Sequence, residues 1–186
     1  MGWFVLAVLA ALAVAVVSIY NRLVKLRNGS ENAWSDIDVQ LKRRYDLVPN
    51  LVETVKGYAS HEQATFEKVT QARARAMEAS SPGDRSSAES GLTRALRGLF
   101  AVSERYPELR ANQNFLSLQQ ELSSLEAALQ NARRYYNAVV RDLNTACEAF
   151  PSNLVAGVFG FARREYFELD DAAERSAPQV SFGSEA

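Results

Sequence analysis

The residues best suited to chemistry are one histidine and a few carboxylates in the first half of the chain. His61 is followed by a glutamate, as in the helical zinc-protease motif, which needs a second histidine four residues after the first. Position 65 is Thr65, so the motif is incomplete. Asp36, Asp38 and Glu53 are also unsuitable, because carboxylate metal sites in helical bundles use several inward Glu residues and Glu-x-x-His repeats. We predict no catalytic, cofactor-binding or metal-binding residues.

The charge balance and the cysteine content exclude further classes of partner and site. The chain has 21 basic and 22 acidic residues and a net charge of -1, so we predict no nucleic-acid partner. The single cysteine, Cys147, excludes an intrachain disulfide and a multi-cysteine metal site. The densest basic cluster is Lys42-Arg43-Arg44. We predict a packing and register role for Arg44, whose long side chain either extends to solvent or pairs with an acid from the third predicted helix, 107–150.

A long helix is predicted to position most of these side chains. Its apolar residues recur at heptad spacing with one polar position, Glu62, and other helices must cover such a stripe: Trp34, Leu41, Val48, Val55, Val69 and Ala76. Because this phase continues across Pro49, we predict a kinked rod that ends near Glu78 rather than a hairpin. Gly29 and Ser30, just before the stripe, predict a flexible joint.

Four segments of the chain have sequences typical of one protein family: YNRLVKLRN (20–28), AWSDIDVQLKRRYDLVPNLVETVKGYASHE (33–62), AVSERYPELRANQNFLSLQQELSSLEAALQNARRYYN (101–137) and FPSNLVAGVFGF (150–161). Together they resemble the LemA family of bacterial membrane-anchored helical proteins, in the family order, from Tyr20 to Phe167. The resemblance implies a membrane-tethered helical bundle that associates with other membrane machinery. Tyr45 stands where that family commonly has a histidine, which argues against a required imidazole there.

The N-terminal segment has the properties of a membrane span. Residues 1–19 carry no charged side chain, and at about 1.5 Å per residue they approach the ~30 Å hydrocarbon core of a bilayer. A cleaved signal peptide is the alternative, with Ala13-Val14-Ala15 as a small-x-small site. Positive residues follow the segment, at Arg22, Lys25 and Arg27, and none precedes it. We predict a single-pass helix in the inner, cytoplasmic membrane with the bundle on the cytoplasmic side.

A stripe of small residues on this helix indicates how copies of the chain could associate. Ala7, Ala11 and Ala15 lie four residues apart and would allow close packing of a second helix. We predict these three alanines as a possible self-association face of a homo-oligomer.

Further helices are predicted after the rod. A turn at residues 79–84 precedes a helix for which Ser86 and Glu89 form a capping box, and which ends near Arg105. Pro107 starts a long helix that ends at Phe150. A short helix is predicted at 153–168. The chain therefore divides into an anchor (1–20), a bundle (21–168) and a mobile polar tail (169–186).

Candidate partner contacts lie in two places. Arg134, Tyr135 and Asn137 are predicted to face outward or toward a neighbouring helix. Phe159 and Phe161 belong to the segment LVAGVFGFARREYF, which is more apolar than one packing face requires. This segment either caps the open end of the bundle, which we favour, or presents an apolar patch to a partner or the bilayer surface.

The predicted fold class is all-α, with an N-terminal transmembrane helix and a long antiparallel up-down bundle of about four helices. The leading hypothesis is a membrane-anchored scaffold or adaptor that engages other membrane or envelope proteins without catalysis of its own. The alternative is an extracytoplasmic bundle that senses a ligand or signals, against which the basic residues after the span argue. An enzyme lacks support, because no nucleophile, base or metal set converges.

Overall fold

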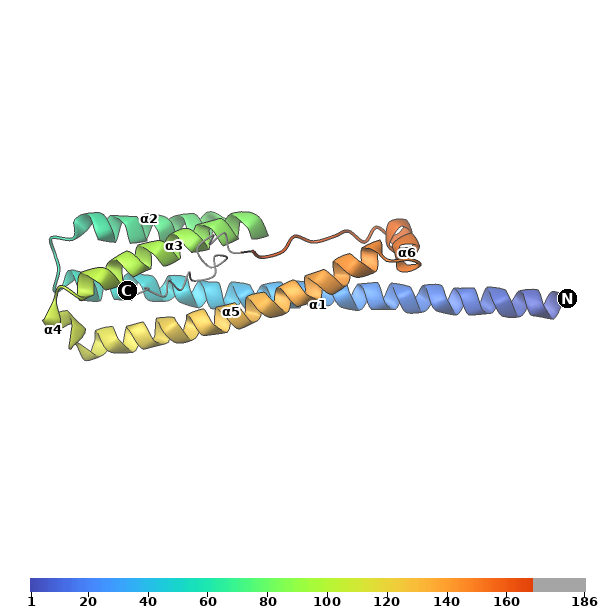
Figure 1. The fold of residues 1–186 in the computed structure, drawn as a ribbon, viewed down its shortest axis with the longest axis horizontal. Coiled ribbons are helices and arrows are strands. Elements are labelled where there is room, and N and C mark those ends of the chain that lie inside the picture. The colour runs from blue at the N-terminus through green and yellow to red at the C-terminus, as the bar shows by residue number, and fades with distance from the viewer. Residues whose placement is uncertain (169–186) are drawn as a thin grey trace, which may run out of the picture.

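The longest element joins an exposed apolar end to the core of a helical bundle. The structure, a computed structural model, describes residues 1–168, and within that range every regular element is a helix. Helix α1 (Gly2–Lys56) is roughly 80 Å long at 1.5 Å per residue. Residues 1–18 are exposed, and the first buried side chain is Leu23. The N-terminal part of α1 projects well beyond the other helices (Figure 1).

The remaining helices pack along the second half of α1. They are α2 (Gln63–Glu78), α3 (Pro82–Ser103), the single turn α4 (Pro107–Arg110), α5 (Gln113–Glu148) and α6 (Ser152–Phe159). Helix α5 returns along α1 and makes its most extensive contact, while α2 and α3 form an antiparallel pair on another side of α1 (Figure 1). The predicted all-α bundle is therefore confirmed.

The first predicted helix is wrong in one respect, because the chain turns back instead of continuing to Glu78. Helix α1 ends at Lys56, and α2 returns beside it, where the Tyr45 hydroxyl donates to the Ala76 carbonyl at 3.2 Å. Val69 and Ala76 are buried as the heptad pattern predicts, but they lie on the second arm of this hairpin. Apolar spacing identifies a buried face and does not reveal a turn between two parts of the stripe.

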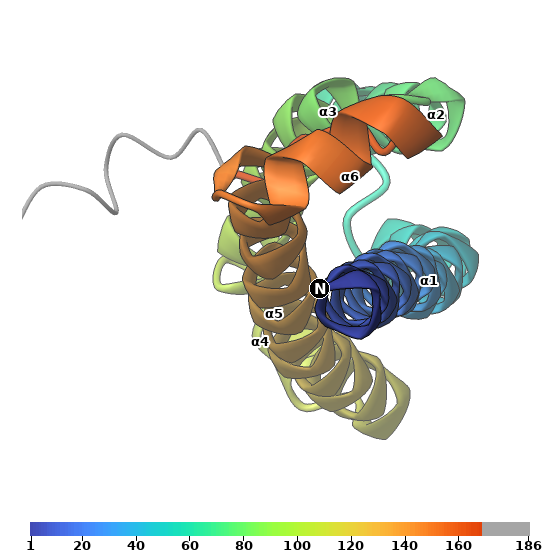
Figure 2. The same ribbon diagram turned by 90° about the vertical axis from the view of Figure 1, so that its right-hand side faces the viewer.

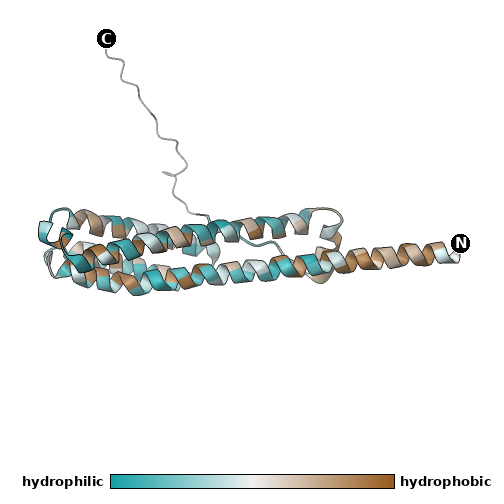
Figure 3. Cartoon of the chain, turned by 90° about the horizontal axis from the view of Figure 1, so that it is seen from below, coloured by the Kyte–Doolittle hydropathy of each residue, from teal (hydrophilic) through white to brown (hydrophobic). Residues whose placement is uncertain are grey.

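Pro49 does not kink the helix, contrary to the prediction. A proline removes the N–H that would bond the carbonyl four residues earlier, which here belongs to Tyr45. Arg73 of α2 supplies a replacement donor, with its Nε 2.7 Å from that carbonyl oxygen. Helix α1 continues through Pro49 and is a nearly straight rod in Figure 3.

The predicted flexible joint at Gly29 and Ser30 is also wrong. Both residues are helical, and Ser30 is fully buried with its hydroxyl donating to the Arg27 carbonyl at 2.7 Å. A Cβ on Gly29 would lie 3.4 Å from Val139 Cγ1, so α5 packs directly against α1 here. The exposed end of α1 is therefore joined to the bundle by packed, continuous helix.

Two helix starts differ from the predictions because other residues provide the caps. Ser81 caps α3 by accepting a hydrogen bond from the Asp84 N–H at 3.1 Å, whereas Ser86 and Glu89 are buried inside the helix. Pro107 starts only the one-turn α4. The long helix α5 starts after Asn112, whose side chain accepts from the backbone of the new helix.

The closing helix is shorter than the predicted 153–168. It ends at Phe159 because Gly160 adopts a left-handed conformation with φ 71°, and the Phe161 N–H bonds back to the Ala156 carbonyl at 2.9 Å. Residues 161–168 then run back along the bundle without helical structure. The predicted tail, 169–186, lies outside the described residues.

Candidate functional site

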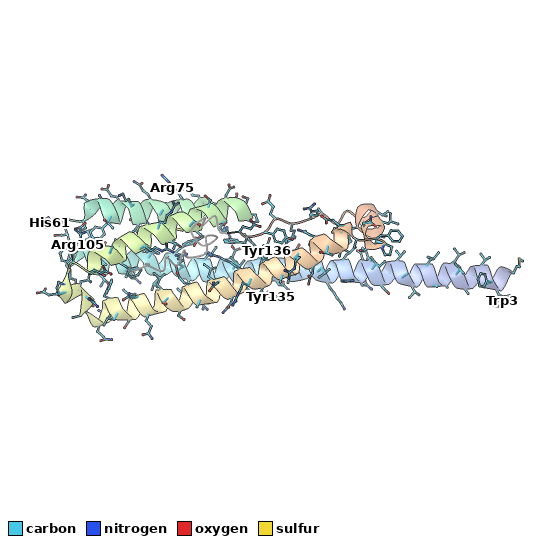
Figure 4. The ribbon with its side chains drawn as sticks, in the orientation of Figure 1. Trp3, His61, Arg75, Arg105, Tyr135 and Tyr136 are labelled. Carbon is cyan, nitrogen blue, oxygen red and sulfur yellow. The ribbon has the colours of Figure 1, made fainter. Side chains whose placement is uncertain are left out.

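The side chains first considered for metal chemistry are dispersed. His61 is exposed in the turn between α1 and α2, at the opposite end of the molecule from Trp3 (Figure 4). Asp38 forms an ion pair with Arg85 instead of joining another acid. Among residues 1–168, no three His, Cys, Asp or Glu side chains are grouped so that they could hold a metal ion.

A buried charged cluster connects three helices at the centre of the bundle. The guanidinium of Arg44 on α1 donates to the carboxylate of Glu89 on α3 at 2.7 Å and to that of Glu126 on α5 at 2.6 Å. It also donates to Thr93 Oγ1 at 2.9 Å. The Tyr45 hydroxyl donates to the other Glu89 oxygen at 2.5 Å. The predicted pairing of Arg44 with an acid from the long third helix is present at Glu126 of α5, and Glu89 of α3 is a second partner that was not predicted.

The electrostatics of this cluster indicate a structural joint. Burial, followed by the neighbouring carboxylate of Glu89, raises the pKa of Tyr45 far above its usual range, so the phenol remains a donor. Burial lowers the pKa of Arg133, whose guanidinium lies 4.8 Å from the ring centroid of Phe167. Arg44 and Glu89 are almost inaccessible to solvent, so the cluster holds α1, α3 and α5 in register.

Two asparagines on α5 hold the segment 161–168 against the bundle. The amide of Asn144 donates to the Arg164 carbonyl and accepts from the Arg164 N–H, both at 2.9 Å. Asn137 makes the same pair of bonds with Phe167, at 3.0 and 2.8 Å. Each side chain thus replaces a backbone partner and satisfies both main-chain polar groups of one residue, Arg164 or Phe167. We call this arrangement the asparagine clamp.

The predicted contact residues on α5 separate into two groups. Tyr135 is 59% exposed, and Arg134 is exposed and bonded only locally, to the side chain of Asn131. Tyr136 and Tyr135 leave α5 on different sides, and Tyr136 is buried (Figure 4). Asn137 already uses its amide in the asparagine clamp, so Arg134 and Tyr135 form the outward part of this group.

A groove runs between α2 and α3 on the outside of the bundle. It has a volume of about 630 Å³, and four of the residues that line it are small: Ala72, Ala88, Gly91 and Ala95. Lys68, Arg75 and Arg94 line it together with one carboxylate, Asp84. A groove lined by small residues and by three cations suits a helix that carries acidic side chains.

The closing segment packs at the end of the bundle nearest the projecting part of α1. Val155 and Ala156 are buried in a small cluster with Leu23 of α1 and Leu143 of α5. This part of α6 covers the end of the bundle, as the favoured interpretation predicts. The ring of Phe161 is half-buried and lies under the guanidinium of Arg27, whereas Phe159 remains exposed.

The small-residue stripe lies wholly outside the bundle. Ala7, Ala11 and Ala15 are exposed on the projecting part of α1. This helix contains a window with a mean hydropathy of 2.6, and none of that window is buried. By length and composition it could cross a membrane.

Four residues hold these surfaces in place through contacts that the sequence did not predict. Glu89 lies three and seven residues before Leu92 and Leu96, so a carboxylate within an apolar stripe was the available signal of a buried ion pair. Asn137 and Asn144 repeat at heptad spacing on α5, which also indicated a shared role. Arg73 gave no signal, since its partner is a main-chain carbonyl.

The sequence is similar to one protein family and to several individual proteins. The sequence profile of the LemA family matches residues 33–182. Magnetosome proteins MamQ 1 and MamQ 2 of Paramagnetospirillum magneticum are each 26% identical over 196 aligned residues, covering 91% of this chain and 72% of the relative. MamQ of Magnetospirillum gryphiswaldense is 24% identical, with 92% and 74% covered. Protein LemA of Metamycoplasma hominis is 29% identical, with 73% and 63% covered. None of these names denotes an enzyme, and together with the apolar end of α1 they indicate a membrane-associated protein.

Proposed function

Because the chain belongs to the LemA family, we propose that it is a membrane-anchored helical scaffold or adaptor. In this role the apolar end of α1 spans the inner membrane once, and the bundle engages other membrane or envelope proteins without catalysis of its own. The basic residues that follow the span, Arg22, Lys25 and Arg27, support a bundle on the cytoplasmic side.

The observation that carries this proposal is the continuity of α1. The same helix contains the exposed apolar end and the buried positions that organise the bundle, including Leu23, Ser30 and Arg44. No loop separates the two parts, so the bundle would stand at a fixed position relative to the bilayer. A fixed, elongated platform suits a protein that presents surfaces to neighbours.

Two surfaces support partner binding. The groove between α2 and α3 offers cations at Arg75 and Arg94 to an acidic helix. The face with Arg134 and Tyr135 offers an exposed aromatic ring beside a cation, a combination enriched where proteins meet. Self-association through Ala7, Ala11 and Ala15 would multiply these surfaces in a homo-oligomer.

Photocrosslinking in living cells tests the adaptor role. A photoreactive amino acid would replace Ser87 in the groove, Tyr135 on the α5 face, and Gln120 as an exposed control on the same helix. We expect a distinct membrane protein to be captured from position 87 or 135 and not from 120. Crosslinks that join only copies of this chain would contradict the adaptor role in favour of self-assembly.

A charge-reversed variant makes the groove experiment specific. R75E combined with R94E should abolish capture from position 87, because two repulsive charges would face an acidic helix. Both side chains are exposed, so the helicity measured by circular dichroism should remain unchanged. Capture that persists in this variant would remove the groove from consideration and leave the Tyr135 face.

A further inference from the structure

Helix α6 lies at the level where the exposed apolar part of α1 ends. Residues 2–20 of α1 would extend roughly 28 Å, close to the ~30 Å of bilayer hydrocarbon. Immediately beyond, the ring of Tyr20 meets that of Phe159 at 4.8 Å between centroids, and Leu23 packs into the small cluster with Val155. Aromatic residues such as Tyr20 are enriched at this depth of a membrane.

The direction of α6 is as informative as its position. Figure 2 looks along α1, which is seen end-on, while α6 lies across the view. A helix that crosses a membrane-spanning helix in this way runs along the bilayer surface. It touches both α1 and α5, so this direction is fixed by packing.

The two faces of α6 differ in what they contact. Val155 and Ala156 face the bundle, whereas the other large apolar residues of this region are exposed: Phe150, Leu154, Val158 and Phe159. Phe150 is 81% and Val158 80% exposed, which is costly for apolar groups in water. Leu154 and Val158 lie four residues apart and share one face of the helix.

Basic side chains flank these apolar segments along the chain, and one of them, Arg163, pairs with Glu148 at 2.8 Å. Arg22 and Lys25 are exposed on the first turns of α1 after the apolar run, and Arg163 is exposed after α6. The side chain of Arg27 extends over Phe161, with its guanidinium carbon 5.3 Å from the ring centroid. An apolar strip beside Lys and Arg is typical of helices that lie in the headgroup region.

We propose that α6 is a second membrane contact, lying flat in the lipid leaflet at which the apolar part of α1 ends, with Phe150, Leu154, Val158 and Phe159 in lipid. This inference rests on the proposed membrane span of α1. The occupant is lipid and not a protein because the exposed face is continuous with the apolar surface of α1, and the bilayer that covers one reaches the other. Figure 3 shows α6 beside the brown, projecting part of α1, at the end of that part nearest the bundle.

Site-directed fluorescence in vesicles tests the lipid contact. The full-length chain carrying C147A would be labelled with an environment-sensitive dye at V158C, at L9C within the span, or at Y135C on α5. Each sample would be reconstituted in vesicles of phosphatidylcholine and phosphatidylglycerol, with nitroxide-bearing lipids as quenchers in the membrane and iodide as the quencher in water. We expect the dye at 158 to be quenched by nitroxide near the headgroup and shielded from iodide, and the dye at 135 to show the reverse.

The position in α1 separates failure of this inference from failure of the anchor. Quenching at 9 by deep nitroxides, with a dye at 158 open to iodide, would overturn the α6 contact and leave the span intact. A dye at 158 shielded from both quenchers would mean that protein covers α6, which also overturns the lipid assignment. Absence of lipid quenching at 9 would instead contradict the membrane span on which the inference rests.

Discussion

Arg73 donates its Nε hydrogen to the carbonyl oxygen of Tyr45, which Pro49 leaves without a helical donor. Helix α2 thus supplies the hydrogen bond that Pro49 removes from α1, and α1 remains straight where its sequence predicts a bend. The contact also fixes α2 along α1, since the two atoms are 2.7 Å apart.

Removing this donor should destabilise the bundle only while the proline is present. R73A should lower the free energy of unfolding by about 1–3 kcal/mol, because a half-buried carbonyl loses its partner. In a P49A background the restored helical N–H serves that carbonyl, so R73A should cost less. Urea unfolding in mild detergent, followed by circular dichroism, measures the four variants of this cycle. Equal costs in both backgrounds would contradict the relationship, and R75A is the control for an exposed arginine on the same helix.

The buried cluster predicts unequal roles for its two acids. E89A leaves the Arg44 guanidinium buried beside a vacated position and should cost about 3–5 kcal/mol of unfolding free energy. E126A should cost much less, because the side chain of Glu126 is 46% exposed and Arg44 retains Glu89. Thermal unfolding of both variants in the same detergent compares them. Similar losses would mean that Arg44 is not held chiefly by Glu89.

The asparagine clamp predicts a change in proteolysis. N144A removes both bonds to Arg164, so the segment 161–168 should detach more often and trypsin should cleave after Arg163 or Arg164 faster. N131A is the matched control, since Asn131 bonds only to the neighbouring Arg134. Mass spectrometry of early fragments would locate the cleavage. Identical rates in the two variants would show that the clamp does not hold the segment.

Tyr45 predicts a loss of stability in alkali with a definite sign. Its pKa in the folded state is raised by burial and by Glu89, whereas an unfolded tyrosine titrates near 10. The stabilising contribution is complete below pH 10 and falls as the pH rises further, by about 1.4 kcal/mol at pH 11. The Y45F variant lacks this contribution, so its unfolding free energy should decline less steeply between pH 9 and 11. Parallel curves for the two proteins would refute the assignment.

Much of the bundle could be predicted because apolar periodicity reports directly on burial. Ile37, Leu41, Val48, Leu51 and Val55 are all buried at heptad positions of α1. The pattern could not locate the turn at residues 57–62, because a returning helix continues the same spacing on its own buried face. Gly57 and Ser60 were the local signals of a turn, but the unbroken heptad spacing on both sides favoured a continuous helix.

The positions of the polar contacts were harder to predict, since they depend on helices distant in sequence. Glu89 fits a capping box locally, yet its partner Arg44 lies 45 residues earlier. The prediction of a flexible joint at Gly29 failed for the same reason, since this part of α1 packs against Val139 of α5. Local residue preferences do not distinguish a loose helix from one that a neighbour approaches closely.

Because α1 is straight and continuous, a tilt of its apolar end would displace the far end of the bundle. From Tyr20 to Lys56 the helix extends roughly 55 Å, so a tilt of about 20°, common for membrane-spanning helices, would sweep its inner end sideways by about 19 Å. A change in bilayer thickness would therefore alter the lateral reach of the α1–α2 turn. Helix α6, lying in the lipid surface as we propose, would resist tilting of α1 toward the side on which α6 lies. The inner end of α1 would therefore move preferentially in other directions.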